Sequence, residues 1–209
     1  MISMETLESI LTRLSGSEEL VPQIVSVLSR AARTGTISYE EVENIDENAE
    51  DILLLANQWR LLVPWRTWRS GEWDDSVLMP APGEMYAMPN IVRELVENAE
   101  QTGNCDLDSA LERLFQRAKE PGWERIPELV HRLTQESRDF TVSVAQIKRI
   151  CSELGLGDRV DSLISELKGS GVMSPKLGAL AKVAEAGSPV YELNRLVFEM
   201  AKIKEDNLS

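Results

Sequence analysis

Apolar residues recur at helical spacing along most of the chain, and one stretch combines the signals of a helix that leads into a strand. Residues 157–175, GDRVDSLISELKGSGVMSP, carry apolar side chains at Val160 and at three, four and seven positions after it. This spacing predicts one buried helical face. Gly169 and Gly171 then predict the helix end, and Val172 begins an extended segment. The pattern predicts a helix that turns through glycine directly into a strand.

The N-terminal half shows the helical pattern several times. Ser38, with Glu41 three residues later, predicts a capping box at the start of one helix. Pro22 suits the first turn of another helix, where its missing N–H costs little. Predicted helices cover about residues 7–14, 18–32, 39–44, 47–60 and 91–99.

Between residues 63 and 90 the helical pattern of apolar residues stops. Prolines and glycines are frequent there, and tryptophans alternate with polar residues. This pattern is typical of short strands joined by turns, and we interpret it as a long β-hairpin. Residues two apart share a face of a strand. Trp65 and Trp68 are therefore predicted to point to opposite faces, one packing inward and one exposed.

The second half of the chain repeats the order of the first. The matching segments are LESILTRL and LDSALERL, VPQIVSVL and IPELVHRL, ISYEEVENI and VSVAQIKRI, MYAMPNIV and VYELNRLV, and residues 46–64 with 157–175. Their offset stays between about 100 and 111 positions, which indicates a repeat of about half the chain. We therefore predict two repeats, residues 1–103 and 104–209.

Each repeat resembles a winged helix-turn-helix domain preceded by one extra helix. The resemblance is carried best by Val142, Ser143, Ile147, Ile150, Val160, Leu163, Ile164, Leu167, Gly171 and Val172. It implies a mainly α fold with small β wings, in the order helix, strand, helix, helix, strand, wing, strand, helix. The first repeat departs from the pattern, with Trp59-Arg60 where the second has glycine. In DNA-binding members the third helix lies in the major groove, which corresponds here to about residues 47–59 and 158–168.

Charge divides unevenly between the repeats. The whole chain carries −13 and has a pI of about 4.6, which disfavours general attraction to nucleic acid or to an acidic membrane surface. Residues 1–103 carry −11 (seven basic, 18 acidic), whereas residues 104–209 carry −2 (15 basic, 17 acidic). Any nucleic-acid contact is therefore predicted in the second repeat, although a solvated helical surface is the simpler interpretation. The candidates are Lys148, Arg149, Arg159, Lys168, Lys176 and Lys182.

Tryptophan and arginine, the residues most enriched at interface hot spots, concentrate between residues 59 and 73. The candidates for a protein interface are Trp65, Arg66, Trp68, Arg69 and Trp73. Stacking on single-stranded nucleic acid would suit the same residues. The alternative is that some of these rings anchor the hairpin to the domain, since a tryptophan ring buries a large area.

Nothing in the sequence indicates catalysis. His131 is the single histidine, and Cys105 and Cys151 do not have the spacing of metal ligands. We expect no enzymatic activity, no cofactor and no metal. We also expect reduced thiols, with Cys151 a small core residue, and a cytoplasmic chain with no signal peptide and no membrane partner.

The leading hypothesis is a non-catalytic tandem winged-helix assembly or regulatory module in a DNA-associated setting such as transcription or chromosome maintenance. Repeat 1 would bind protein, and repeat 2 would supply any nucleic-acid contact. The runner-up is a sequence-specific DNA-binding transcription regulator, and the third alternative is a protein-docking adaptor with no nucleic-acid link. The sequence leaves self-association open.

Overall fold

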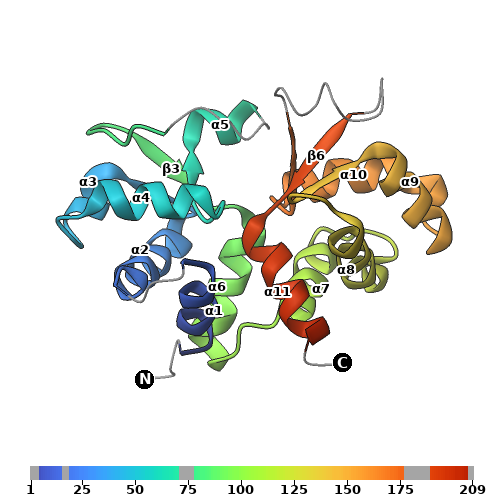
Figure 1. The fold of residues 1–209 in the computed structure, drawn as a ribbon, viewed down its shortest axis with the longest axis horizontal. Helices are drawn as coiled ribbons and strands as arrows, with labels where there is room; N and C mark the ends of the chain where they lie inside the picture. Colours follow the sequence, from blue (N-terminus) through green and yellow to red (C-terminus); the bar gives the residue numbers. More distant parts are fainter. Residues whose placement is uncertain (1–4, 16–18, 71–77, 177–188, 207–209) are drawn as a thin grey trace. The chain divides into compact units, whose positions relative to one another are not determined.

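The computed structural model describes residues 5–15, 19–70, 78–176 and 189–206. These residues form two compact units, of which the first ends at Asp106 and the second begins at Leu107. Both units are mainly helical, and each contains one small antiparallel sheet of three strands (Figure 1). The mainly α fold with small β elements that the sequence predicts is confirmed. No helix among the described residues is long and apolar enough to cross a membrane.

Unit 1 packs its helices around a short sheet in the order β1-β3-β2. Its elements are α1 (Glu5–Ser15), α2 (Val21–Thr34), β1 (Thr36–Ser38), α3 (Tyr39–Glu43), α4 (Ala49–Gln58), β2 (Val63–Pro64), α5 (Trp65–Ser70), β3 (Met85–Ala87) and α6 (Asn90–Thr102). Leu28 of α2, Ile52 of α4, Tyr86 of β3 and Leu95 of α6 are fully buried. These apolar faces form one core, as the helical spacing predicts.

Unit 2 has the same plan, with a sheet in the order β4-β6-β5. Its elements are α7 (Leu107–Arg117), the 3₁₀ turn η1 (Trp123–Arg125), α8 (Ile126–Glu136), β4 (Thr141–Ser143), α9 (Val144–Glu153), the 3₁₀ turn η2 (Gly157–Arg159), α10 (Val160–Gly169), β5 (Met173–Pro175), β6 (Val190–Leu193) and α11 (Arg195–Asp206). Cys151 is buried in α9, which confirms it as a core residue.

The two sheets repeat each other in register. Thr36 pairs with Ala87 in unit 1 and Thr141 with Glu192 in unit 2, so both partners lie 105 positions later (36 to 141, 87 to 192). On the other edge, Pro64 pairs with Tyr86 and Pro175 with Tyr191. This second edge is offset by 111 positions (64 to 175). The six extra residues lie in α9 and the turn after it, because α3 has five residues and α9 has ten.

The turn from α4 into β2 has the same backbone conformation as the turn from α10 into β5, although the first repeat has Arg60 where the second has Gly171. Gly171 has φ 75°, and its counterpart Arg60 has φ 57°. Both turns form the same backbone hydrogen bond, from Leu61 N to the Ala56 carbonyl and from Val172 N to the Leu167 carbonyl. An L-residue in the left-handed region costs about 1–2 kcal/mol. Arg60 therefore keeps the winding of the turn at an energetic cost.

One prediction from the aromatic segment is wrong. Residues 65–70 form the helix α5, not a strand of a long hairpin. Proline cannot donate to the ladder, and β2 ends at Pro64. Trp65 and Trp68 are three residues apart, which fits helical spacing as well as strand alternation. They therefore lie on neighbouring positions of one helical side and not on opposite faces.

The capping box that the sequence predicts at Ser38 is present, and an equivalent one opens α9. Ser38 Oγ accepts from Glu41 N, and Ser143 Oγ accepts from Gln146 N at the same distance of 3.2 Å. We expect Ser143→Ala to lower the free energy of unfolding of unit 2 by about 1 kcal/mol, since an N-cap hydrogen bond is lost. Urea denaturation would measure this, with Ser38→Ala expected to have the same effect on unit 1. A loss in only one unit would contradict the equivalence of the two boxes.

Candidate functional surfaces

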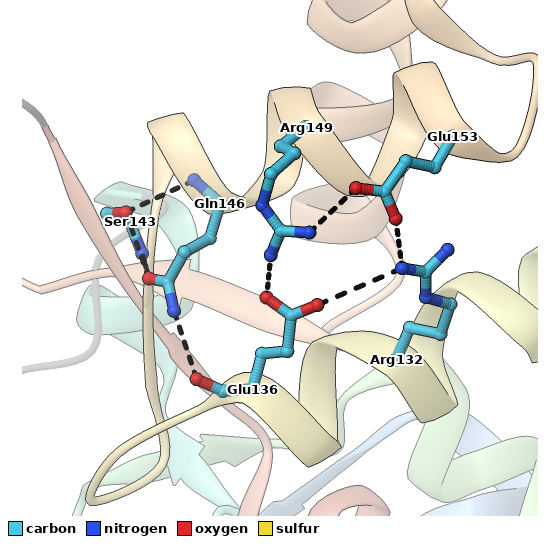
Figure 2. A network of polar contacts seen from close by, with 6 residues as sticks. All are labelled: Arg132, Glu136, Ser143, Gln146, Arg149 and Glu153. Atoms are coloured by element: carbon cyan, nitrogen blue, oxygen red, sulfur yellow. Dashed lines mark hydrogen bonds and ion pairs between the residues drawn. The ribbon is translucent and has the colours of Figure 1, made fainter.

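A network of charged side chains joins α8 to α9 in unit 2 (Figure 2). Arg149 Nη1 donates to Glu153 Oε1 at 2.8 Å and also forms an ion pair with Glu136. Arg132 pairs with Glu153 and lies 3.9 Å from Glu136. Hydrogen bonds from Arg132 and, with a smaller effect, from Arg149 lower the pKa of Glu153. Both arginines are therefore balanced by carboxylates within the unit.

Two further candidate nucleic-acid contacts are also engaged within unit 2. Arg159 donates to the carboxylate of the buried Glu120 and to the carbonyl of Pro121. Lys176 Nζ lies 3.9 Å from Glu192, and the Lys176 side chain is only 12% exposed. These two cations hold loops and strands together, which limits what they can offer to a phosphate backbone.

The remaining candidates differ in exposure. Lys148 is exposed on α9, Lys168 is half-buried on α10, and Lys182 lies outside the described residues. The structure therefore does not gather the candidate cations into one unpaired surface among the described residues. The sequence could not indicate this, because the paired carboxylates come from other elements.

Neighbouring residues of α9 allow the role of these cations to be tested. We expect Arg149→Ala to lower the stability of unit 2 only slightly, because exposed ion pairs contribute little, and to leave duplex DNA affinity unchanged. Lys148→Ala removes the same charge from the adjacent exposed position and should change neither property. Urea denaturation and fluorescence anisotropy with a labelled duplex at low salt would measure both. Equal weakening of duplex binding by the two variants would indicate that these cations contact nucleic acid.

The structure brings together a second polar cluster that sequence reasoning missed. His131 Nε2 of α8 lies 2.8 Å from Asp108 Oδ1 of α7, and Lys204 of α11 pairs with the other carboxylate oxygen. Burial alone would raise the pKa of Asp108, but the hydrogen bonds from Lys204 and His131 outweigh it and lower the pKa. The cluster ties three helices together. A histidine and an aspartate 23 positions apart gave no local signal.

The cysteines are not placed for nucleophilic chemistry. Burial raises the pKa of the Cys105 thiol to about 12, so this side chain stays protonated near neutral pH. Burial also raises the pKa of Cys151. No group of three His, Cys, Asp or Glu side chains in the described part of the chain is placed to hold a metal ion.

The aromatic candidates lie on α5, which packs against β2 and β3. Trp65 and Arg66 are exposed and Trp68 is half-buried, whereas Thr67 is buried. The Arg69 side chain and Trp73 lie outside what the structure describes. The structure thus offers Trp65 and Arg66 as the accessible part of the predicted interface.

In the part of the chain that the structure describes, the large exposed apolar side chains belong to unit 1. Among the described residues they are Ile45, Leu54, Trp65, Met79 and Met85. Met85 is 41% exposed, and its counterpart Val190, 105 positions later, is 9% exposed. Ile45 is 37% exposed, whereas Leu156, which lies four residues before α10 as Ile45 lies four before α4, is 6% exposed. Unit 1 therefore exposes apolar surface at positions that unit 2 covers.

The exposed side of α4 combines one of these apolar residues with carboxylates. Glu50, Asp51, Leu54 and Gln58 are all exposed, as is Glu47 just before the helix. Within the helix, Glu50 and Asp51 lie four and three positions before Leu54, and Gln58 lies four positions after it, so these residues share one helical side. We call these five residues the α4 face. Buried residues of the same helix, such as Ile52 and Leu53, face the core of unit 1.

Comparison with known proteins gives a family. A protein-family model matches residues 5–204, which covers both units, and the chain belongs to that family. No curated protein and no solved structure matches the chain.

Proposed function

We propose that this chain is a non-catalytic, tandem winged helix-turn-helix protein that binds a protein partner through unit 1. The assignment to winged helices is supported by the element order within each unit. After an extra first helix, both units show helix, strand, helix, helix, strand, strand and helix among the described elements, with α5 added between β2 and β3 of unit 1. In each sheet the third strand lies between the first two. This is the order that the sequence resemblance implies.

The observation that carries the docking role is the exposed apolar surface of unit 1. Matched positions of unit 2 provide an internal control. Val190 and Leu156, the counterparts of Met85 and Ile45, are buried, and the counterpart of Leu54 is the polar residue Ser165. Single exposed apolar residues are ordinary on protein surfaces. Among the described residues the large ones occur in only one of two units with the same fold. The fold itself does not require this difference, whereas a partner bound to unit 1 would explain it.

Nucleic acid is the weaker candidate partner. Arg149, Arg159 and Lys176 all pair with carboxylates inside unit 2. In unit 1, residues 34–59 contain no lysine or arginine, so the helix at the DNA-reading position of the superfold would be repelled by phosphate. A setting in transcription or chromosome maintenance stays compatible with this proposal through the partner and not through direct DNA contact.

Affinity purification of the full-length tagged chain from its host, with nuclease treatment throughout, tests the proposal. One variant combines Leu54→Ser, Trp65→Ala and Met85→Ser, and the control carries Ser165→Ala on the exposed side of unit 2. We expect a partner protein that wild type and control retain and the triple variant loses, with melting temperatures unchanged. Retention of the same proteins by all three chains, or their loss on nuclease treatment, would overturn the proposal.

A further inference from the structure

The α4 face is the part of unit 1 whose shape and charge say most about the chemistry of a partner. Leu54 is 39% exposed there, with Glu50 and Asp51 one turn before it and Gln58 one turn after it. Leu54 is therefore a single exposed apolar contact point, bordered by polar side chains on a regular helix. An apolar stripe on another helix would cover it.

Unit 2 shows that the fold does not require Leu54. By the 111-position offset its counterpart on α10 is Ser165, which is also exposed. The counterparts of Glu50 and Asp51 are Asp161 and Ser162. The same helix in the same place therefore remains folded with a wholly polar exposed side.

The carboxylates of the α4 face have no cationic partner among the described residues. Glu47, Glu50 and Asp51, together with Glu43 of α3, form no ion pair with any cation in the described part of the chain. An uncompensated negative field around an exposed apolar side chain favours a positively charged partner.

Two of these carboxylates, Glu50 and Glu43, act on the buried Tyr39. It begins α3 and is buried. Burial raises its pKa, and the charges of Glu50, Glu43 and Glu40 raise it further. Carboxylates from α3 and α4 therefore contribute to the same local field.

We infer that the α4 face receives a cationic amphipathic helix of the partner protein, whose apolar stripe covers Leu54 and whose lysines or arginines face Glu47, Glu50 and Asp51. This inference rests on the proposed function and specifies its binding surface. Burial of Leu54 supplies apolar contact, and the charge pairs set orientation and speed of association.

A labelled peptide of defined sequence, LKKLLKLLKKLLKL, serves as the probe in fluorescence anisotropy with the full chain. We expect Leu54→Ser, and separately Glu50→Gln with Asp51→Asn, each to weaken peptide binding about tenfold, the range of an interface hot spot. Asp161→Asn removes a carboxylate at the counterpart of Glu50 and should leave affinity unchanged. A peptide with the same composition and no amphipathic order should bind at least about tenfold more weakly.

Absence of peptide binding, or equal weakening by the α4 and Asp161 variants, would overturn the inference, since the latter indicates general charge attraction. The same two α4-face variants, Leu54→Ser and the combined Glu50→Gln and Asp51→Asn, separate the two proposals when they are used in the host purification. Loss of the partner with Leu54→Ser supports both. A partner that the triple variant loses and that both α4-face variants retain leaves unit 1 as the docking unit but overturns the α4 face as its binding surface.

Discussion

Glu192→Ala is expected to lower the free energy of unfolding of unit 2 by about 3–5 kcal/mol, the usual effect of breaking a buried ion pair by removing one partner. Glu192 lies on the central strand β6, and its side chain is almost completely buried. Its carboxylate accepts from Arg195 Nε at 3.1 Å and lies 3.9 Å from Lys176 Nζ. Without it, two largely buried cations would lose their countercharge.

Unit 1 indicates that the effect comes from charge and not from the strand. The register counterpart of Glu192 is Ala87, which is buried in β3. Alanine therefore suits this position of the sheet. Trp123 is the single tryptophan after residue 106, so a fluorotryptophan signal from it would report the urea unfolding of unit 2.

Combining Glu192→Ala with Lys176→Met provides the control for this prediction. The double variant removes one of the two uncompensated cations, and we expect it to recover part of the lost stability. A loss below about 1 kcal/mol for Glu192→Ala alone would contradict the assigned role of the ion cluster. If the double variant recovers no stability, the loss in Glu192→Ala comes from altered packing and not from uncompensated charge.

Tyr86→Ala is expected to destabilise unit 1 by about 3–5 kcal/mol, as for other large aromatic residues removed from cores. Tyr86 is fully buried on the central strand β3, opposite Ile37 on one side and Pro64 on the other. Its hydroxyl donates to Glu84 Oε2 at 2.8 Å. Burial first, and this hydrogen bond second, raise the pKa of Tyr86 well above its usual range.

Tyr191 is the matched control for Tyr86. It occupies the same register position of the second sheet, opposite Val142 and Pro175, but it is partly exposed. We expect Tyr191→Ala to cost at most about 2 kcal/mol, because less apolar area is lost. Urea denaturation followed by circular dichroism would compare the two, and equal losses would contradict the difference in core packing.

The features that the sequence predicts well depend on local spacing. The helices α2, α4 and α10, the Ser38 capping box and the buried Cys151 all follow from the pattern of nearby residues. The repeat also predicts the shared plan of the two sheets, since matching segments have matching neighbours. These signals are strong because helix periodicity and caps act within a few residues.

The features that the sequence misses depend on tertiary contacts or on ambiguous spacing. Trp65 and Trp68 fit both a strand and a helix, and the strand interpretation was wrong. Arg60 adopts a left-handed conformation that favours glycine, so its turn could not be recognised from residue type. The pairing of Arg159 with Glu120 joins residues 39 positions apart. Candidate cations in the sequence are therefore poor guides to a binding surface until their partners are known.

Site-specific photo-crosslinking in the host tests most directly whether unit 1 is the docking unit. A photoreactive amino acid would be placed at Leu54 and Trp65 in separate chains, and at the matched exposed position Ser165 of unit 2. We predict a protein adduct from position 54 or 65 that survives nuclease treatment, and none from position 165. An adduct of equal yield from position 165, or adducts with nucleic acid alone, would contradict the account.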